Sequence, residues 1–273
     1  MQDFISPPEA TPRRRFVPRH PAGNPLILRE NGLELRLATS PSDTIEAQRL
    51  RFDVFHQELR LGGLVASRAD GLDQDAHDSH CDHLLVIDTG RDCLAGTYRL
   101  LPFDRVPSFG FYSESEFDLA NLKRSGLRPL ELGRSCVALE YRNGNVIRLL
   151  FRGIAEYLHR CNANALMGCA SVYGVGGAEL SAIQRMLLRD FLVEPELRVT
   201  PRRGFDVPSF PICADVDEAS TLRNLPPLFK GYLRLGAKVC GSPAHDRQFG
   251  TTDFFMLART GDITGRFGRR FIA

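Results

Sequence analysis

Apolar residues alternate with polar ones, or form short continuous runs, in several separate stretches of this chain. Such patterns are typical of β-strands. The clearest are LELRLA at 33–38, HLLVID at 83–88, CLAGTYRLL at 93–101, ELGRSCVAL at 131–139 and ALMGCASVYG at 165–174. A Gly-Arg-Asp turn joins the second and third stretches and predicts a hairpin. KVCGSP and DFFMLAR, later in the chain, are expected to close the sheet.

Helical spacing occupies the segments between these strands. Ser42 or Asp43 can cap a helix that runs to about residue 60, and residues 146–160 predict a strongly amphipathic helix. The residues expected on the apolar faces are Leu50, Val54, Phe55 and Leu59 in the first helix, and Ile147, Leu150, Ile154, Tyr157 and Leu158 in the second.

The S-x-x-E spacing of Ser113 and Glu116 fits a capping box and predicts a helix over 113–122. Further helices are expected in ELSAIQRMLLRDFL and at 225–237. The order β-α-β-β-α-β-α-β resembles the GNAT acyltransferase-like fold, an α/β fold whose central mixed sheet carries helices on both faces. The proline-rich residues 1–30 predict a disordered arm, and residues 31–273 a single domain.

Composition narrows the class of protein. The chain of 273 residues is 43% hydrophobic and 25% charged, with a net charge of +2, so no extensive basic surface for nucleic acid is expected. Seven cysteines without a CxxC pair fit neither a disulfide framework nor a zinc ribbon. We see no signal peptide and no run of about 18 apolar residues, and we expect a cytoplasmic protein.

The stretch GLDQDAHDSHCDHLLVID, at 71–88, concentrates groups that could bind a metal. A calcium loop would need Gly where Asp78 stands and Glu where Leu84 stands. His80, Cys81 and His83 are too crowded for a tetrahedral zinc site. We therefore predict no metal here.

A zwitterionic amino acid fits this stretch better, because arginine binds a carboxylate bidentately and an aspartate pairs with an ammonium. The candidates for this substrate site lie in the loop, the first helix and the strands. They are Arg51, Phe55, Asp75, Asp78 and Asp82, with Arg99 and Arg134 near the same end of the sheet.

The motifs RFDVF, GTYRLLP and ELGRSCV, together with Asp75 and Asp78, are similar to those of acyl-homoserine lactone synthases. The blocks CDHLLVID, GFYSESEFDL, LELGRSCV, RGIAEYL, GCAS and LPPLFKGYLRLGAKVCGSPA resemble the ornithine N-acyltransferases more closely, over about 45–265. That resemblance implies transfer of a 3-hydroxyacyl chain from acyl carrier protein to the α-amine of ornithine, giving lyso-ornithine lipid. The only prosthetic group it implies is the donor's 4′-phosphopantetheine, and none on this chain.

Two features depart from these families. The chain contains no tryptophan, and Leu61 stands near where lactone synthases place an aromatic residue. Residues 174–210 resemble no block of either family. If that segment shapes the acceptor pocket, the acceptor could be another amino acid, such as glutamine, glycine or lysine.

Amide formation from a thioester requires a base, because an α-amine is largely protonated near neutral pH. Glu131, at the head of a central strand, is our candidate. An ion pair with Arg134 or Arg99 is the structural alternative, in which one arginine would orient Glu131 and the other could bind the substrate carboxylate. Arg134 reaches the same pocket edge only if a β-bulge breaks the alternation of the strand.

The donor site is expected at the turn before the long helix. Arg142, Asn143, Gly144 and Arg148 lie there, but the full glycine-rich pyrophosphate motif of coenzyme A users is missing. A single phosphate needs fewer amides, which favours a carrier protein as donor. Two groups of basic residues could dock this acidic carrier or touch the inner membrane peripherally. They are Arg142, Arg148 and Arg152 at the start of the long helix, and Lys230, Arg234 and Lys238 near the late helix.

We therefore predict a metal-independent N-acyltransferase in which Glu131, Arg134 and Arg99 are catalytic. A lactone synthase using S-adenosylmethionine is the main rival among enzymes. A non-catalytic sensor of acyl chains or lipids is the alternative from another class.

Overall fold

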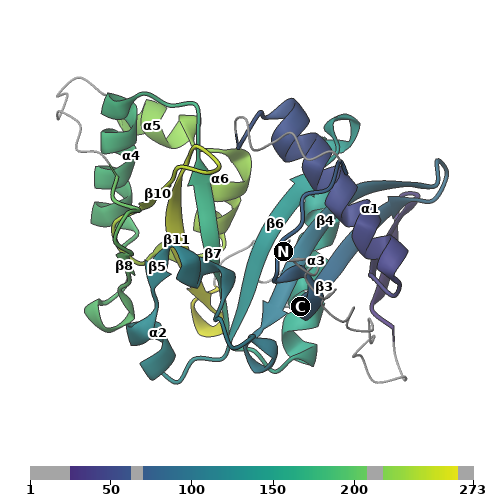
Figure 1. The fold of residues 1–273 in the computed structure, drawn as a ribbon, viewed down its shortest axis with the longest axis horizontal. Coiled ribbons are helices and arrows are strands. Elements are labelled where there is room, and N and C mark those ends of the chain that lie inside the picture. Colours follow the sequence, from purple (N-terminus) through teal and green to yellow (C-terminus); the bar gives the residue numbers. More distant parts are fainter. Residues whose placement is uncertain (1–24, 63–69, 208–217, 264–273) are drawn as a thin grey trace, which may run out of the picture.

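The computed structural model describes residues 25–62, 70–207 and 218–263. Its main sheet has the strand order β1-β2-β3-β4-β6-β7-β11-β10, with β9 also paired to β11 (Figure 1). The strands are β1 (Ile27–Glu30), β2 (Leu33–Leu37), β3 (Asp82–Asp88), β4 (Cys93–Pro102), β6 (Pro129–Val137), β7 (Ala165–Val172), β9 (Lys238–Val239), β10 (Ala244–Asp246) and β11 (Thr251–Arg259). A small second sheet pairs β5 (Phe117–Asp118) with β8 (Thr200–Pro201).

Strands β6 and β7 form the parallel pair at the centre of an otherwise antiparallel sheet. Their pairing covers three residues of each strand, from Pro129–Glu131 opposite Ala165–Met167, and the strands separate beyond it. Gly168 lies where they part. A Cβ placed on it would sit 2.3 Å from the carbonyl oxygen of Leu132, so this close approach of two backbones requires glycine.

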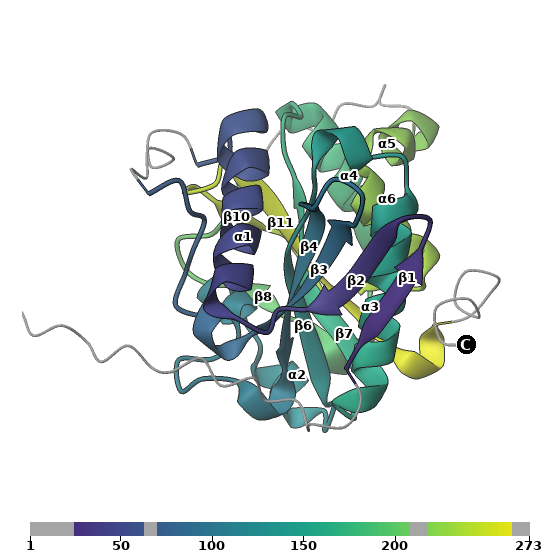
Figure 2. The same cartoon turned by 90° about the vertical axis from the view of Figure 1, so that its right-hand side faces the viewer.

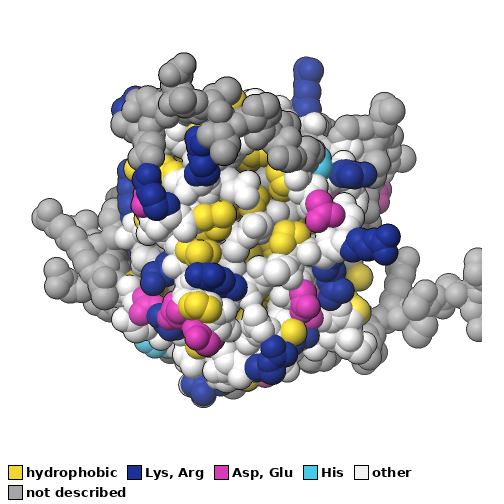
Figure 3. Space-filling view, turned by 90° about the vertical axis from the view of Figure 1, so that its left-hand side faces the viewer, with side chains coloured by type: hydrophobic (Ala, Val, Ile, Leu, Met, Phe, Trp, Pro, Cys, Tyr) yellow, Lys and Arg dark blue, Asp and Glu magenta, His cyan; other side chains and the backbone are white. Residues whose placement is uncertain are grey.

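Helices cover both faces of the sheet (Figure 2). Helix α1 (Pro41–Phe52) packs on β4 and β6, and α3 (Asn145–Arg160) lies on the opposite face over β2, β3 and β4. The remaining helices are α2 (Ala120–Arg124), α4 (Gly177–Asp190), α5 (Glu218–Asn224) and α6 (Pro227–Arg234). On the side of the molecule that carries α4, charges of both signs lie among scattered apolar side chains (Figure 3).

Two hydrophobic cores result, one on each face of the sheet. Strand β11 contributes to both, because Phe254 and Met256 belong to the core under α3, α4 and α6, whereas Phe255 and Leu257 belong to the core beneath α2 and β5. This alternation is the two-residue period of a strand buried on both sides. Among the described helices, none is both long and apolar enough to span a bilayer.

The predicted mixed α/β fold is confirmed, with several local corrections. Residues 27–30 of the predicted arm form β1 on the edge of the sheet, while residues 1–24 lie outside the described residues. Ser40, rather than Ser42 or Asp43, caps helix α1, and its hydroxyl accepts a hydrogen bond from the Asp43 amide. After Phe52 the helix continues as a π-helical segment to Glu58. Its buried residues include Arg51 as well as Ala47, Gln48 and Phe52.

The prediction of a helix over 113–122 is also wrong. A short 3-10 helix (Tyr112–Ser115) leads into β5, and the helix α2 starts only at Ala120. The acid that caps the 3-10 helix is Glu114, whose carboxylate accepts a hydrogen bond from the Phe111 amide at 2.8 Å. Glu116 is buried instead, because the chain turns there towards the sheet.

Candidate active site

A cavity of about 1430 Å³ opens where β6 and β7 separate. The diverging halves of both strands line it, as do the start of α3, the helix α6 and the Tyr112–Ser113 turn. Because the two strands stop pairing after Glu131, their facing edges border the cavity and can offer backbone groups to a bound molecule.

Glu131 stands at the last paired position of β6, on the wall of this cavity, and is 4% exposed. Its carboxylate accepts hydrogen bonds from the Tyr112 and Ser113 amides, both at 2.8 Å, and from the Ser113 hydroxyl at 2.6 Å. The predicted ion pair with Arg134 or Arg99 is wrong. One turn of 3-10 helix orients this carboxylate. The sequence did not predict Tyr112 or Ser113 as site residues, and it assigned Ser113 to a helix cap instead.

The bulge that Arg134 requires is present in β6. Gly133 pairs with Arg99 and Cys136 with Thr97, so that Arg134 and Ser135 together oppose one residue of β4. Arg134 has a φ of 51°, a left-handed conformation that is unusual for a residue other than glycine. Its guanidinium lies 4.8 Å from the ring centres of both Tyr112 and Phe249 on the cavity wall.

The arginines predicted for the substrate site pair with the acidic loop. Arg51 donates to Asp73 Oδ1 at 2.6 and 2.8 Å and to Asp78 Oδ1 at 2.9 Å. Arg99 donates to Asp75 at 2.7 Å and to Asp78 at 2.8 Å. We call this set, together with Arg134, the arginine–aspartate network.

Arg134 completes the network through Asp75, to which it donates at 3.2 Å, and through Asp73, at 3.4 Å from its Nε. Three arginines therefore balance three aspartates. Burial by itself would raise the pKa of Asp78, but the adjacent charges of Arg51 and Arg99 hold it well below its usual range. Asp73 was not selected by the sequence as a member of this group.

The predicted substrate ligands separate into two groups. Phe55, Arg99 and Arg134 line the cavity, whereas Arg51, Asp75 and Asp78 do not. The Arg51 side chain is 1% exposed and fully engaged, so a direct contact with a substrate would require its ion pairs to break.

Asp82 lies away from this network. It accepts hydrogen bonds from Arg105 at 2.8 Å and from the Tyr157 hydroxyl at 2.5 Å. Its expected place in the substrate site is not supported, because it does not line the cavity and one of its two partners, Tyr157, belongs to α3.

The predicted donor residues surround the start of α3. Gly144 caps this helix with a φ of 91°, and the Asn143 side chain accepts a hydrogen bond from the Asn145 amide at 3.0 Å. Arg142 forms a bidentate ion pair with Glu58, and Arg148 contacts Glu30 at 2.7 Å. Of the four predicted residues, Arg142, Gly144 and Arg148 line the cavity and Asn143 does not.

An acetyltransferase (GNAT) domain matches residues 50–152 of the chain. The L-ornithine N(alpha)-acyltransferase of Brucella abortus (strain 2308) is 37% identical over 256 residues, which cover 90% of this chain and 91% of that protein. The enzyme of the same name from Agrobacterium fabrum (strain C58) is 36% identical over 245 residues, covering 86% of this chain and 83% of that protein.

The chain belongs to the L-ornithine N(alpha)-acyltransferase family. The predicted resemblance is therefore confirmed. Among solved structures, FeeM, an N-acyl amino acid synthase from uncultured soil microbes, aligns with this family member at a TM-score of 0.49 and 11% identity, over 85% of this chain and 93% of that one.

Of the catalytic and substrate residues predicted for this ornithine N-acyltransferase family member, the structure places Phe55, Arg99, Glu131 and Arg134 on the cavity wall. The sequence missed three buried acids near the same cavity, Glu116, Asp246 and Asp253, whose oxygens lie within 4.8 Å of one another. No local pattern links them, because they come from a loop and two late strands.

Proposed function

We propose that this protein transfers a 3-hydroxyacyl chain from acyl carrier protein to the α-amine of ornithine. The observation that supports it most strongly is the family identity over nine tenths of the chain, together with a carboxylate fixed where β6 and β7 separate. Family membership favours this function over the lactone synthase and the sensor.

In the proposed reaction the α-amine attacks the thioester carbonyl, the new C–N bond forms, the amine loses a proton and the pantetheine thiolate leaves. Glu131 is the base. The Ser113 hydroxyl, which donates to Glu131 Oε1, can accept the amine proton while it passes its own proton to the carboxylate. Ser113 also lines the cavity, so it can reach a bound amine.

The donor enters between the separated strands in this proposal. Pantetheine is an extended chain with amide groups, and unpaired strand edges bind extended chains through backbone hydrogen bonds. The bulge at Arg134 frees amides of β6 that can donate to the oxyanion that develops from the thioester oxygen. Apolar residues beyond the separation offer space for the acyl chain, among them Leu132, Phe151 and Leu235.

The arginine–aspartate network positions the bulge. Arg134 is held between two aromatic rings and two aspartates, and Arg99 and Arg51 hold those aspartates in turn. We assign Arg51, Asp75 and Asp78 to this positioning role, and Arg134 and Arg99 to the cavity wall near the acceptor carboxylate.

The carrier protein docks, in this proposal, at the basic rim of the cavity. Arg148, Arg152 and Arg234 line the cavity. The side chains of Arg148 and Arg152 are about half exposed although both pair with Glu30, and Arg234 is exposed. Basic side chains at an entrance attract an acidic carrier protein. Peripheral contact with a membrane stays a prediction.

The test is a mass-resolved reaction of the purified protein with a 3-hydroxyacyl carrier protein and ornithine. Parallel reactions contain acyl-coenzyme A as donor, or S-adenosylmethionine as acceptor. We expect acyl-ornithine from the carrier protein, and a loss of turnover of about 100-fold or more in E131Q, the usual range for a general base. A lactone product, or full activity in E131Q, would contradict the function or the base respectively.

A further inference from the structure

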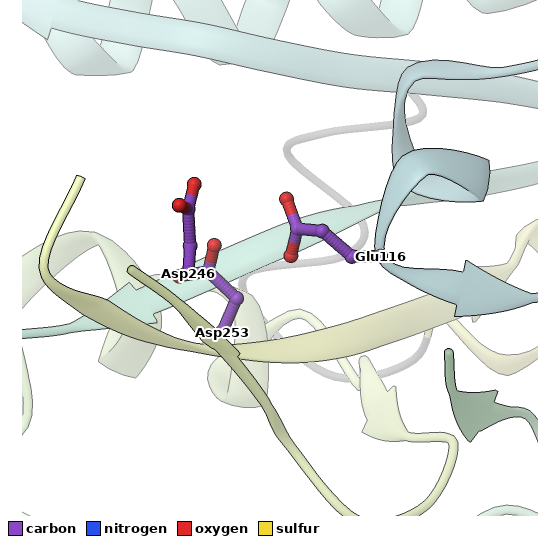
Figure 4. A group of neighbouring side chains, drawn as sticks. All are labelled: Glu116, Asp246 and Asp253. Carbon is purple, nitrogen blue, oxygen red and sulfur yellow. The ribbon is translucent and has the colours of Figure 1, made fainter. Parts of the chain in front are cut away.

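Three carboxylates from separate parts of the chain meet beside the active-site cavity (Figure 4). Glu116 follows the 3-10 helix, Asp246 ends β10 and Asp253 lies in β11. They are 2%, 8% and 5% exposed, and we call them the triacid cluster. In Figure 4 the side chains of Glu116 and Asp246 extend towards the same space above Asp253.

Two oxygens of the triacid cluster have no protein partner in the described part of the chain. Within the described residues, none of its members forms an ion pair with a lysine, arginine or histidine, and Glu116 Oε2 and Asp253 Oδ1 have no hydrogen-bond partner. The hydroxyls of Ser171 and Thr251 bond to Asp253, and Arg134 is the arginine whose charge acts to lower the pKa of Glu116.

Asp246 uses Oδ1 locally, accepting from the Gln248 amide at 2.7 Å and the Phe249 amide at 3.1 Å. Buried carboxylate oxygens without partners are rare and costly, so this arrangement suits a bound positive group.

The electrostatics of the cluster support the same conclusion. Burial, and after it the negative charge of Asp253, raises the pKa of Glu116 to about 9. Burial likewise raises the pKa of Asp253. Glu116 therefore retains its proton at neutral pH, and a bound cation would favour its ionised form.

The cluster belongs to the same cavity as the proposed base. Asp246 and Asp253 line this cavity together with Glu131 and Ser113. The register of the sheet fixes the spacing between the cluster and the proposed base. Asp253 pairs with Ser171 of β7. Two residues earlier on the same strand, the Cys169 thiol lies 3.5 Å from the Ser113 hydroxyl.

Two residues along a strand correspond to roughly 6–7 Å. The two nitrogens of ornithine are separated by five single bonds of about 1.5 Å each, or roughly 6 Å when the chain is extended. One amine can thus stand near Ser113 and Glu131 while the other reaches the cluster.

We propose that Glu116, Asp246 and Asp253 bind the side-chain ammonium of the acceptor amino acid and so select ornithine. The inference rests on the proposed function and names the residues that determine its acceptor. An ammonium group has three N–H donors and one positive charge, which suits carboxylate oxygens that have no other partner. An inorganic divalent cation has related chemistry and is separated from the ammonium by the experiment below.

The experiment compares ornithine with norvaline, which has the same carbon chain without the side-chain amine. For the wild type we expect kcat/KM to be at least about 100-fold higher with ornithine, because a site built for a polar group rejects an analogue that lacks it. In D253N and in E116Q this ratio is expected to fall at least tenfold. The matched control is E114Q, two residues from Glu116 in the same turn, where Glu114 pairs with Lys123 at 2.5 Å; its ratio should stay unchanged.

Calorimetric binding of ornithine and norvaline to the same variants gives a readout independent of acyl transfer. A wild type that binds ornithine no better than norvaline would overturn the inference, as would D253N and E116Q proteins that keep the wild-type preference. A wild type inactivated by a chelator and restored by Mg²⁺ or Mn²⁺, with no response in D253N, would assign the cluster to a metal instead. If the protein acylated ornithine and norvaline at equal rates, the proposed acyl transfer would stand and only the selection of ornithine by the cluster would be refuted. If no acyl transfer occurred but ornithine were still bound in preference to norvaline, the proposed function would be refuted and the role of the cluster in binding ornithine would be supported.

Discussion

Replacing Glu116 with glutamine should make the ligand-free protein more stable. In the wild type, burial and the neighbouring Asp253 raise the pKa of Glu116 from 4.5 to about 9. At a pH between these two pKa values, the folded state binds a proton that the unfolded state has released. The free energy of unfolding therefore falls as the pH rises through this window. The glutamine amide has nearly the same shape, carries no charge and can donate a hydrogen bond to a neighbouring carboxylate.

The size of the effect follows from the difference between the two pKa values. Each pH unit above the pKa of the unfolded state lowers the free energy of unfolding by roughly 1.4 kcal/mol. At pH 7 the penalty that Glu116 imposes is therefore on the order of 3 kcal/mol, and it grows by about the same amount between about pH 6 and about pH 8. These values are upper limits, because water that enters the adjoining cavity weakens the cost of burial.

The assay is urea unfolding of the wild type, E116Q and E114Q at about pH 6 and about pH 8. Because the chain contains no tryptophan, unfolding is followed by circular dichroism. We expect the free energy of unfolding of E116Q to exceed that of the wild type, and by more at the higher pH. E114Q, which removes the carboxylate that pairs with Lys123, should bring no gain at either pH.

Two outcomes would refute this reasoning. One is an E116Q protein that is less stable than the wild type at about pH 8; the other is a difference that does not depend on pH. Either result would mean that Glu116 is already compensated in the folded state. If the prediction holds, a variant that is more stable yet less selective for ornithine would show that the site keeps a destabilising carboxyl group for its function.

Two further changes test the scaffold around the site. R51M should lower the free energy of unfolding by about 3–5 kcal/mol, because Asp73 and Asp78 would remain as buried charges without their main partner; urea unfolding that shows a loss below about 1 kcal/mol would contradict the role of the network. G168A should destabilise the junction of β6 and β7, because the new methyl group would stand 2.3 Å from the Leu132 carbonyl oxygen, and the rate of acyl transfer should fall with it. A melting temperature equal to that of the wild type would show that this junction does not require glycine.

Local pattern was sufficient for most of the sheet and for α3. The runs at 83–88, 93–101 and 165–174 form strands at nearly the expected residues, and α3 begins one residue before its predicted start. Side chains on one strand or helix are placed by a fixed geometric period, which the chain shows directly. Pattern failed at 113–122, where a valid capping-box spacing was overridden by the turn that brings Tyr112 and Ser113 onto Glu131.

Residue type indicated the arginines and aspartates of the site, but tertiary structure decided how they pair. The sequence could not show that Arg51 faces Asp73 or that Glu131 pairs with neither Arg99 nor Arg134, because those contacts depend on how α1 and the acidic loop pack against β4 and β6. The triacid cluster is the extreme case. Glu116 and Asp253 are far apart in the chain and become neighbours only when β11 joins β7, so their raised pKa values are a property of the folded sheet and of no local segment.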